Sequence, residues 1–185
     1  MKNKILCMGL MLAVSVGSAV AADFRLSSAD IKDNGAIDNK FVYQGMGCQG
    51  QNVSPALSWS GAPAGTKSFA LLVHDPDAPT GGAGWWHWIV YNIPAAANSI
   101  PQGAGTAEGN GLPKGTMQGK TDFGSSGYGG PCPPPGHGKH HYHFTLYALK
   151  VDKLDVPAGA SAAQVGYMAN ANAIGKARLT GLYGR

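Results

Sequence analysis

The sequence predicts a mainly β protein, an antiparallel β-sandwich with one short helical segment near the C-terminus. Its apolar and alternating stretches are short and are separated by turns rich in Gly and Pro. These strand patterns do not alternate with helical patterns, as they would in a parallel α/β sheet. A chain of 185 residues with 28 Gly and 13% charged residues favours short strands joined by many tight loops.

The first 21 residues have the organisation of a secretory signal peptide. Residues 1–4 are a short basic start, residues 5–16 are apolar, and residues 17–21 end in an Ala-x-Ala site. The apolar run is too short for a membrane span, and we identify no later one. We expect cleavage after Ala21 or, alternatively, Ala22, a single domain over residues 22–185, and a periplasmic or secreted protein.

The strands are expected in the following order along the chain. Short strands are predicted at residues 24–28, 41–43 and 56–59, and a turn at residues 62–66. The unbroken apolar run at residues 68–74 predicts a strand buried on both faces, and residues 86–94 predict a second central strand. Residues 101–130 are Gly-rich and lack a period, so we expect a long surface excursion.

The last third of the chain adds a strand, a helix and a strand. Residues 141–149 alternate strongly and predict a third central strand. Residues 161–171 predict the helix, with Ser161 as its N-cap. Residues 179–183 predict a final strand.

A Pro-rich loop at residues 130–142 indicates a preformed binding site. Its four prolines reduce the entropy lost when the loop is fixed, so polar groups at the strand entrance are held in one geometry. Strand alternation places His140 and Tyr142 on one face and His141 and His143 on the other. The backbone at Gly130 can approach a ligand closely.

A second group of polar residues follows the buried strand. Because Pro76 cannot donate to a sheet ladder, the strand ends at Asp75, and Asp75 and Asp77 emerge at the sheet rim. A short hairpin then returns through aromatic residues to His87, which we expect near Asp75. Alternatively, these Asp residues only stabilise the turn by hydrogen bonding to the backbone. For Asp77 the turn role and the binding role are equally open.

Two cysteines remain after signal removal, Cys48 and Cys132. In an oxidising compartment we expect them to form a disulfide that pins the Pro-rich loop to the segment around Cys48. Two free buried thiols are the alternative. Without Lys2 and Lys4, 12 basic and 10 acidic residues remain, and they are scattered, so we expect no nucleic-acid partner.

Together these segments resemble the phosphatidylethanolamine-binding protein family, and in particular its bacterial, exported, Raf-kinase-inhibitor-like branch. The resemblance rests on residues 75–79, 87–88 and 92–94, and on residues 130–134 and 138–142. The sequence differs from the family pattern at His141 and His143. These differences affect the expected surface for a protein partner more than they affect the expected pocket.

The resemblance implies a β-sandwich with a small pocket for phosphate or a phosphorylated headgroup such as phosphoethanolamine. It implies that Asp75, His87, His140 and Tyr142 line the pocket. Trp85, Gly130 and Pro131 are implied to lie beside them. It also makes a protein partner reasonable, which the protein would inhibit or modulate, whereas a homodimer stays open. We predict no cofactor and no enzymatic activity.

Two other functions stay open at this stage. A hydrolase would use Asp75, His87 and His140 as orienter, base and acid, but the sequence offers no clear nucleophile. A metal-binding protein would use the histidine-rich segment, with His141 and His143 together on the outer face.

Overall fold

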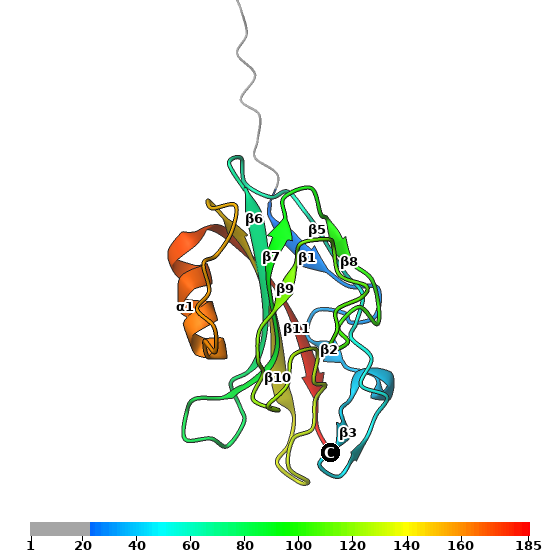
Figure 1. Ribbon diagram of the computed structural model, residues 1–185. Coiled ribbons are helices and arrows are strands. Elements are labelled where there is room, and N and C mark those ends of the chain that lie inside the picture. Colours follow the sequence, from blue (N-terminus) through cyan, green and yellow to red (C-terminus); the bar gives the residue numbers. More distant parts are fainter. Residues whose placement is uncertain (1–22) are drawn as a thin grey trace, which may run out of the picture.

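A six-stranded sheet forms the centre of the computed structural model, which describes residues 23–185 (Figure 1). The predicted signal peptide and its cleavage site therefore lie outside the described residues. The strand order is β2-β11-β10-β6-β7-β9. Neighbouring strands are antiparallel except for the pair β2 and β11. The strands are β2 (Gly35–Ala36), β6 (Ser68–Asp75), β7 (Trp85–Pro94), β9 (Met117–Gln118), β10 (His140–Leu149) and β11 (Ala173–Tyr183).

A smaller sheet packs on one face of the central sheet, and a helix packs on the other (Figure 1). The small sheet contains β1 (Arg25–Ser27), β5 (Leu57–Ser60) and β8 (Ser99–Ile100), and the helix is α1 (Ala162–Asn172). A two-stranded hairpin, β3 (Gln44–Gly45) and β4 (Cys48–Gln49), lies at the end of the molecule where the chain finishes. The predicted mainly β sandwich with a helix near the C-terminus is confirmed.

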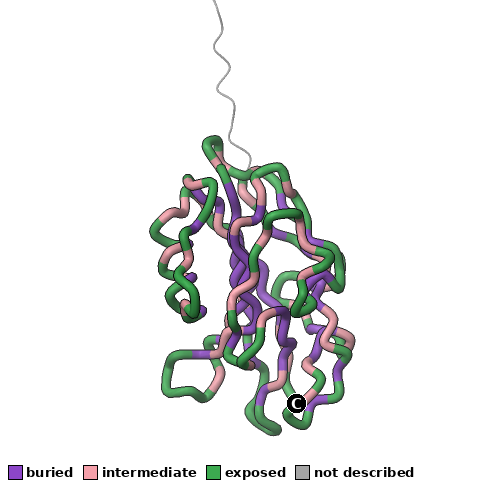
Figure 2. Tube along the Cα trace, in the orientation of Figure 1, coloured by how far each residue is buried: buried purple, intermediate pink, exposed green. Residues whose placement is uncertain are grey.

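The central strands are buried on both faces (Figure 2). In β6, Phe69, Leu71 and Val73 face the small sheet, whereas Ala70 and Leu72 face α1. This confirms the prediction of a doubly buried strand and explains why its apolar run is unbroken. Ser161 caps α1 as predicted, because its Oγ accepts a hydrogen bond from the Gln164 N–H at 3.2 Å.

Two strand predictions need correction. Residues 41–43 do not form a strand: a 3-10 helix, η1 (Asn39–Phe41), ends there, and Asp38 caps it by accepting from the Lys40 N–H. The final strand, predicted at residues 179–183, is β11 and begins at Ala173, directly after α1. Its first residues, Ala173 to Lys176, are half-buried or exposed, and Ile174 is the one large apolar side chain among them, so no alternating apolar pattern marked the start of the strand.

The excursion at residues 101–130 is mostly irregular, but its end is buried, contrary to the surface position expected. The Tyr128 hydroxyl donates to the Phe41 carbonyl at 3.0 Å, and Tyr128, Gly129 and Gly130 are buried. The excursion therefore becomes part of the wall behind the end of the sheet. In the described part of the chain, no helix is long and apolar enough to cross a membrane.

Candidate functional site

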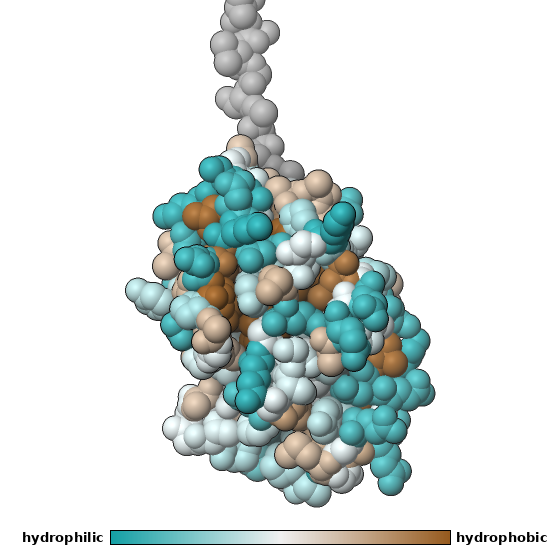
Figure 3. Space-filling view, viewed as in Figure 1, coloured by the Kyte–Doolittle hydropathy of each residue, from teal (hydrophilic) through white to brown (hydrophobic). Residues whose placement is uncertain are grey.

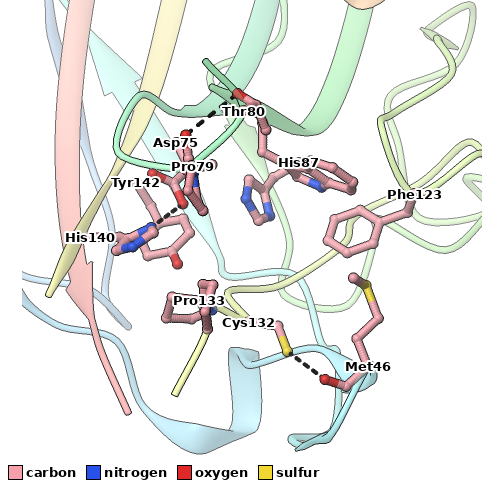
Figure 4. A pocket seen from close by; sticks show the side chains of 13 residues that line it. Met46, Asp75, Pro79, Thr80, His87, Phe123, Cys132, Pro133, His140 and Tyr142 are labelled. Atoms are coloured by element: carbon pink, nitrogen blue, oxygen red, sulfur yellow. Dashed lines mark hydrogen bonds and ion pairs between the residues drawn. The ribbon is translucent and has the colours of Figure 1, made fainter. Parts of the chain in front are cut away.

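A cavity of about 200 Å³ opens at one end of the central sheet, where β6 ends and β7 and β10 begin (Figure 4). The three strands each bring polar side chains to it, since Asp75 is the last residue of β6, and Trp85 and His140 begin β7 and β10. Its lining residues are Met46, Asp75, Ala78, Pro79, Thr80, Trp85, His87, Phe123, Cys132, Pro133, Pro134, His140 and Tyr142.

Asp75 is a buried carboxylate that is held from two sides. Its Oδ2 accepts from the His140 Nδ1–H at 2.7 Å, and its Oδ1 accepts from the Asp77 N–H at 2.8 Å. The side chains of Asp75 and His140 are 4% and 2% exposed. The sequence predicted that Asp75 meets His87, but the hydrogen-bond partner of Asp75 is His140, whereas His87 pairs with the Gly129 carbonyl and lines the same cavity.

The second nitrogen of His140 is also engaged. His140 Nε2 lies 2.8 Å from Nδ1 of His137, a loop residue exposed to solvent. With Nδ1–H committed to Asp75, a neutral His140 accepts at Nε2, and His137 is then the donor. These three side chains form a hydrogen-bonded chain from a buried carboxylate to the surface.

His87 is buried and neutral at physiological pH. Its Nδ1 lies 2.6 Å from the Gly129 carbonyl oxygen, which can only accept, so Nδ1 carries the proton. Burial lowers the pKa of His87 to about 4, despite the opposing effects of the Gly129 carbonyl and the Asp75 charge. Its ring packs edge-on against Tyr142, with centroids 5.1 Å apart.

This burial predicts a loss of stability in mild acid. Because the folded-state pKa lies below the ordinary 6.5, the unfolded chain binds a proton that the folded protein excludes. His87 therefore has little effect on the free energy of unfolding above pH 6.5. As the pH drops towards 4 it lowers this free energy, by about 2 kcal/mol between pH 7 and pH 5.

Urea denaturation at pH 7 and pH 5 measures this loss. His87→Asn is the control, because an amide N–H can still reach Gly129 but does not titrate. We expect the loss in the variant to be smaller by about 2 kcal/mol. Equal losses in the two proteins would contradict a buried neutral His87.

Two buried donors among the cavity-lining residues make no hydrogen bond of normal length and angle to the described residues, although the Asp75 carboxylate lies close to the Tyr142 hydroxyl. These are the Trp85 indole Nε1–H and the Tyr142 hydroxyl. Burial and then the Asp75 charge raise the pKa of Tyr142 above its usual range, so its hydroxyl keeps its proton. A buried donor without an acceptor is costly, so these two groups are candidates for contact with a bound ligand.

Apolar side chains surround this polar base. Phe123, Pro133 and Pro134 contribute to the wall, and Met46 lies at the edge with 65% of its surface exposed (Figure 4). The end of the molecule that carries these loops is mostly of intermediate hydropathy on the face in Figure 3, whereas hydrophilic residues gather along the right-hand side. The cavity therefore joins a few polar groups to a mainly apolar rim.

Three predicted site residues lie behind or beside the cavity and do not line it. The Gly130 N–H donates to Asn52 Oδ1 at 2.8 Å, and the Pro131 carbonyl accepts from the Tyr43 N–H at 3.1 Å. A Cβ at Gly130 would lie 2.1 Å from the Phe41 carbonyl oxygen, so glycine is needed there for close backbone packing. Asp77 faces outward and accepts from the His141 Nδ1–H at 2.7 Å.

Cys48 and Cys132 form a disulfide across 84 residues of sequence. It joins the β3–β4 hairpin to the Pro-rich loop, as predicted, and Cys132 itself lines the cavity. The bond thereby fixes one wall of the site.

Sequence reasoning missed Phe123, Met46 and His137. Phe123, from the excursion before the Pro-rich loop, and Met46, from the turn of the β3–β4 hairpin, lie outside the two motifs and reach the cavity through packing. His137 lies inside the Pro-rich segment, and its position three residues before His140 was the available signal.

The outer histidines do not gather into a metal site. His143 Nδ1 pairs with Thr180 Oγ1 at 3.1 Å, and His141 pairs with Asp77. Over residues 23–185, no group of three or more His, Cys, Asp or Glu side chains is arranged to hold a metal ion. The open metal hypothesis therefore has no supporting cluster in this part of the chain.

The fold and the site define a β-sandwich protein with a small polar-based cavity at one end of its central sheet. A family model described as phosphatidylethanolamine-binding protein matches residues 27–184. The chain belongs to that family, as the sequence motifs predicted.

Relatives of this chain occur in several bacteria. UPF0098 protein YbcL of Escherichia coli K12 is 50% identical over 180 residues, which cover 97% of this chain and 98% of YbcL. The crystal structure of E. coli YbcL is described as that of a new member of the mammalian PEBP family. It matches this chain with a TM-score of 0.85 and 51% sequence identity, and the match covers 89% of this chain and 99% of YbcL. The putative lipoprotein LppC of Mycobacterium tuberculosis H37Rv is 44% identical over 136 residues, which cover 74% of this chain and 62% of LppC.

Proposed function

We propose that this protein is exported and binds a small anion or a phosphorylated headgroup, such as phosphate or phosphoethanolamine, in the cavity at the end of the central sheet. The observation that carries this proposal is the pair of unsatisfied buried donors, Trp85 Nε1–H and Tyr142 O–H. Leaving such a donor unpaired costs about 1–3 kcal/mol, so phosphoryl oxygens would be stabilised there. The family name makes a phospholipid headgroup one source of that chemistry.

Export is supported by three independent features. Residues 1–21 have the composition and order of a secretory signal. The disulfide between Cys48 and Cys132 suits an oxidising compartment. A relative, LppC, carries the name of a putative lipoprotein.

The cavity is better suited to binding than to catalysis. Thr80, the one hydroxyl besides Tyr142 among its described lining residues, donates to the Gly84 carbonyl at 3.0 Å. Ser125 and Ser126 line a separate cavity. An inhibitory or modulating effect on a protein partner would act through the surface around the cavity mouth, where Met46 is exposed.

Isothermal titration of the oxidised mature protein with phosphate and phosphoethanolamine tests this function. We expect saturable one-site binding that Tyr142→Phe weakens by about tenfold to a hundredfold, as expected for one hydrogen bond to a charged group. Tyr167→Phe, on the exposed face of α1, is the matched control and should bind like the wild type.

Equal affinity of Tyr142→Phe and the wild type would contradict the proposed role of the cavity. Turnover of phosphate or acyl esters that disappears in His140→Ala would instead favour the hydrolase alternative.

A further inference from the structure

A second cavity, of about 460 Å³, is lined by residues from the segments 43–54, 103–107 and 121–129. Phe123 lines both this cavity and the first one, so the two are neighbours. Its volume lies within the range of small-molecule sites, about 300–1,000 Å³. None of the residues that line it carries a formal charge. We call this second cavity the neutral groove, and the proposed anion-binding function does not use it.

The floor of the neutral groove is held in place by buried hydrogen bonds. Asn52 Nδ2 donates to the Tyr128 carbonyl at 3.0 Å, and Ser54 Oγ accepts from the Gly105 N–H at 2.8 Å. A Cβ at Gly105 would lie 2.8 Å from the Cβ atoms of both Ser54 and Tyr128, so glycine is needed for this close packing. The two walls are therefore fastened to each other, and a ligand would enter a hollow that already exists.

An aromatic pair contributes to one wall of the neutral groove. The rings of Tyr43 and Phe123 stack with centroids 4.3 Å apart and an angle of 25° between their planes, and both residues are half-buried. A Cβ at Gly129 would lie 2.3 Å from the Phe123 ring, so this ring rests against the backbone, which fixes its position. The pair therefore offers a rigid apolar surface on which another ring can pack.

Four polar side chains of the neutral groove are free to bind a ligand. Within residues 23–185, the side chains of Gln44, Gln51, Ser125 and Ser126 form no hydrogen bond of normal length and angle, and all four residues are exposed or half-buried. An amide group and a hydroxyl group can each donate and accept. A ligand that suits them must also donate and accept, and it need not carry a charge.

We propose that the neutral groove binds a neutral carbohydrate such as a disaccharide. Each sugar hydroxyl both donates and accepts, as do the free amide and hydroxyl groups of the groove. The C–H face of a sugar ring would pack on the pair formed by Tyr43 and Phe123. No Lys or Arg lines the groove, so a phosphate or a nucleotide would find no cationic partner there.

Titration of the ¹⁵N-labelled protein with N,N′-diacetylchitobiose and with maltose, followed in a ¹H–¹⁵N spectrum, tests the proposal. We expect saturable shifts of the side-chain amide resonances of Gln44 and Gln51, with a dissociation constant on the order of 1 mM for a few neutral hydrogen bonds. The side-chain amide of Gln164 is the internal control, because it is also exposed but lies on α1. Tri-alanine is the peptide comparison and should cause no saturable shift.

Two pairs of variants separate the neutral groove from the rest of the surface. Gln51→Ala should weaken disaccharide binding about threefold to tenfold, as expected for one lost hydrogen bond, whereas Gln164→Ala should bind like the wild type. Tyr43→Leu should also weaken binding, and Tyr167→Leu, on the exposed face of α1, is its control. Tyr142→Phe, a variant of the first cavity, should bind the disaccharide normally, so the anion site and the neutral groove are tested separately.

Absence of saturable shifts with both disaccharides up to about 50 mM would overturn the proposal. Shifts of equal size at Gln164 would overturn it as well, because binding would then not be confined to the neutral groove. Saturable binding of tri-alanine without a response to either disaccharide would identify a peptide site and would also contradict the proposal.

Discussion

Replacing Cys48 and Cys132 together by serine is expected to lower the free energy of unfolding by about 4 kcal/mol. The disulfide closes a loop across 84 residues, and removing it restores the conformational freedom of that loop in the unfolded chain. It also releases the Pro-rich loop from the β3–β4 hairpin, so the cavity wall at Cys132 and Pro133 loses its support.

Urea denaturation with and without reductant measures this effect. The reduced wild type and the double serine variant should unfold at nearly the same urea concentration, and reductant should leave the variant unchanged. A difference below about 1 kcal/mol between oxidised and reduced wild type would show that the bond adds little to folding.

Asp75→Ala is expected to destabilise the protein by about 3 kcal/mol, because it leaves the buried His140 Nδ1–H without its acceptor. The chain contains its own control. His141 and Asp77 form the same kind of pair at the same 2.7 Å separation, but their side chains are 50% and 40% exposed, against 2% and 4% for His140 and Asp75. Asp77→Ala should therefore cost about 1 kcal/mol or less, since water replaces the lost partner.

The difference between the two variants in urea denaturation at pH 7 is the informative quantity. Similar losses in both would mean that burial does not set the importance of Asp75. A folded Asp75→Ala protein should also show a changed affinity for phosphate, because the His140 ring has lost the carboxylate that fixes its orientation.

Local patterns in the sequence predicted the elements that frame the site. The apolar run of β6, the alternation in β10 and the Ser161 cap each follow from neighbouring residues, so they could be identified without the structure. The motifs also placed Asp75, His87, His140 and Tyr142 at strand ends, where the structure brings them to one cavity.

Features that depend on distant contacts could not be predicted in this way. The approach of Phe123 and Met46 to the cavity depends on how the excursion at residues 101–130 and the turn of the β3–β4 hairpin pack against the end of the central sheet. The role of Gly130 in packing against Phe41 became apparent only with the backbone in place, and so did the pairing of its N–H with Asn52. At residues 41–43 the apolar side chains resemble a strand, but the Asp38 cap starts a 3-10 helix just before them.

The central claim is that the buried donors of Trp85 and Tyr142 hold an anion, and the indole N–H resonances test it most directly. A two-dimensional ¹H–¹⁵N spectrum of the protein can be followed during a phosphate titration, with Trp85→Phe used for assignment. Trp59 Nε1 is also buried without a partner but does not line the cavity, and Trp88 Nε1 donates to Gln118 at 2.7 Å, so both are internal controls. We predict a saturable downfield shift of the Trp85 resonance while those of Trp59 and Trp88 stay in place. A Trp85 resonance that does not move at saturating phosphate would contradict the claim.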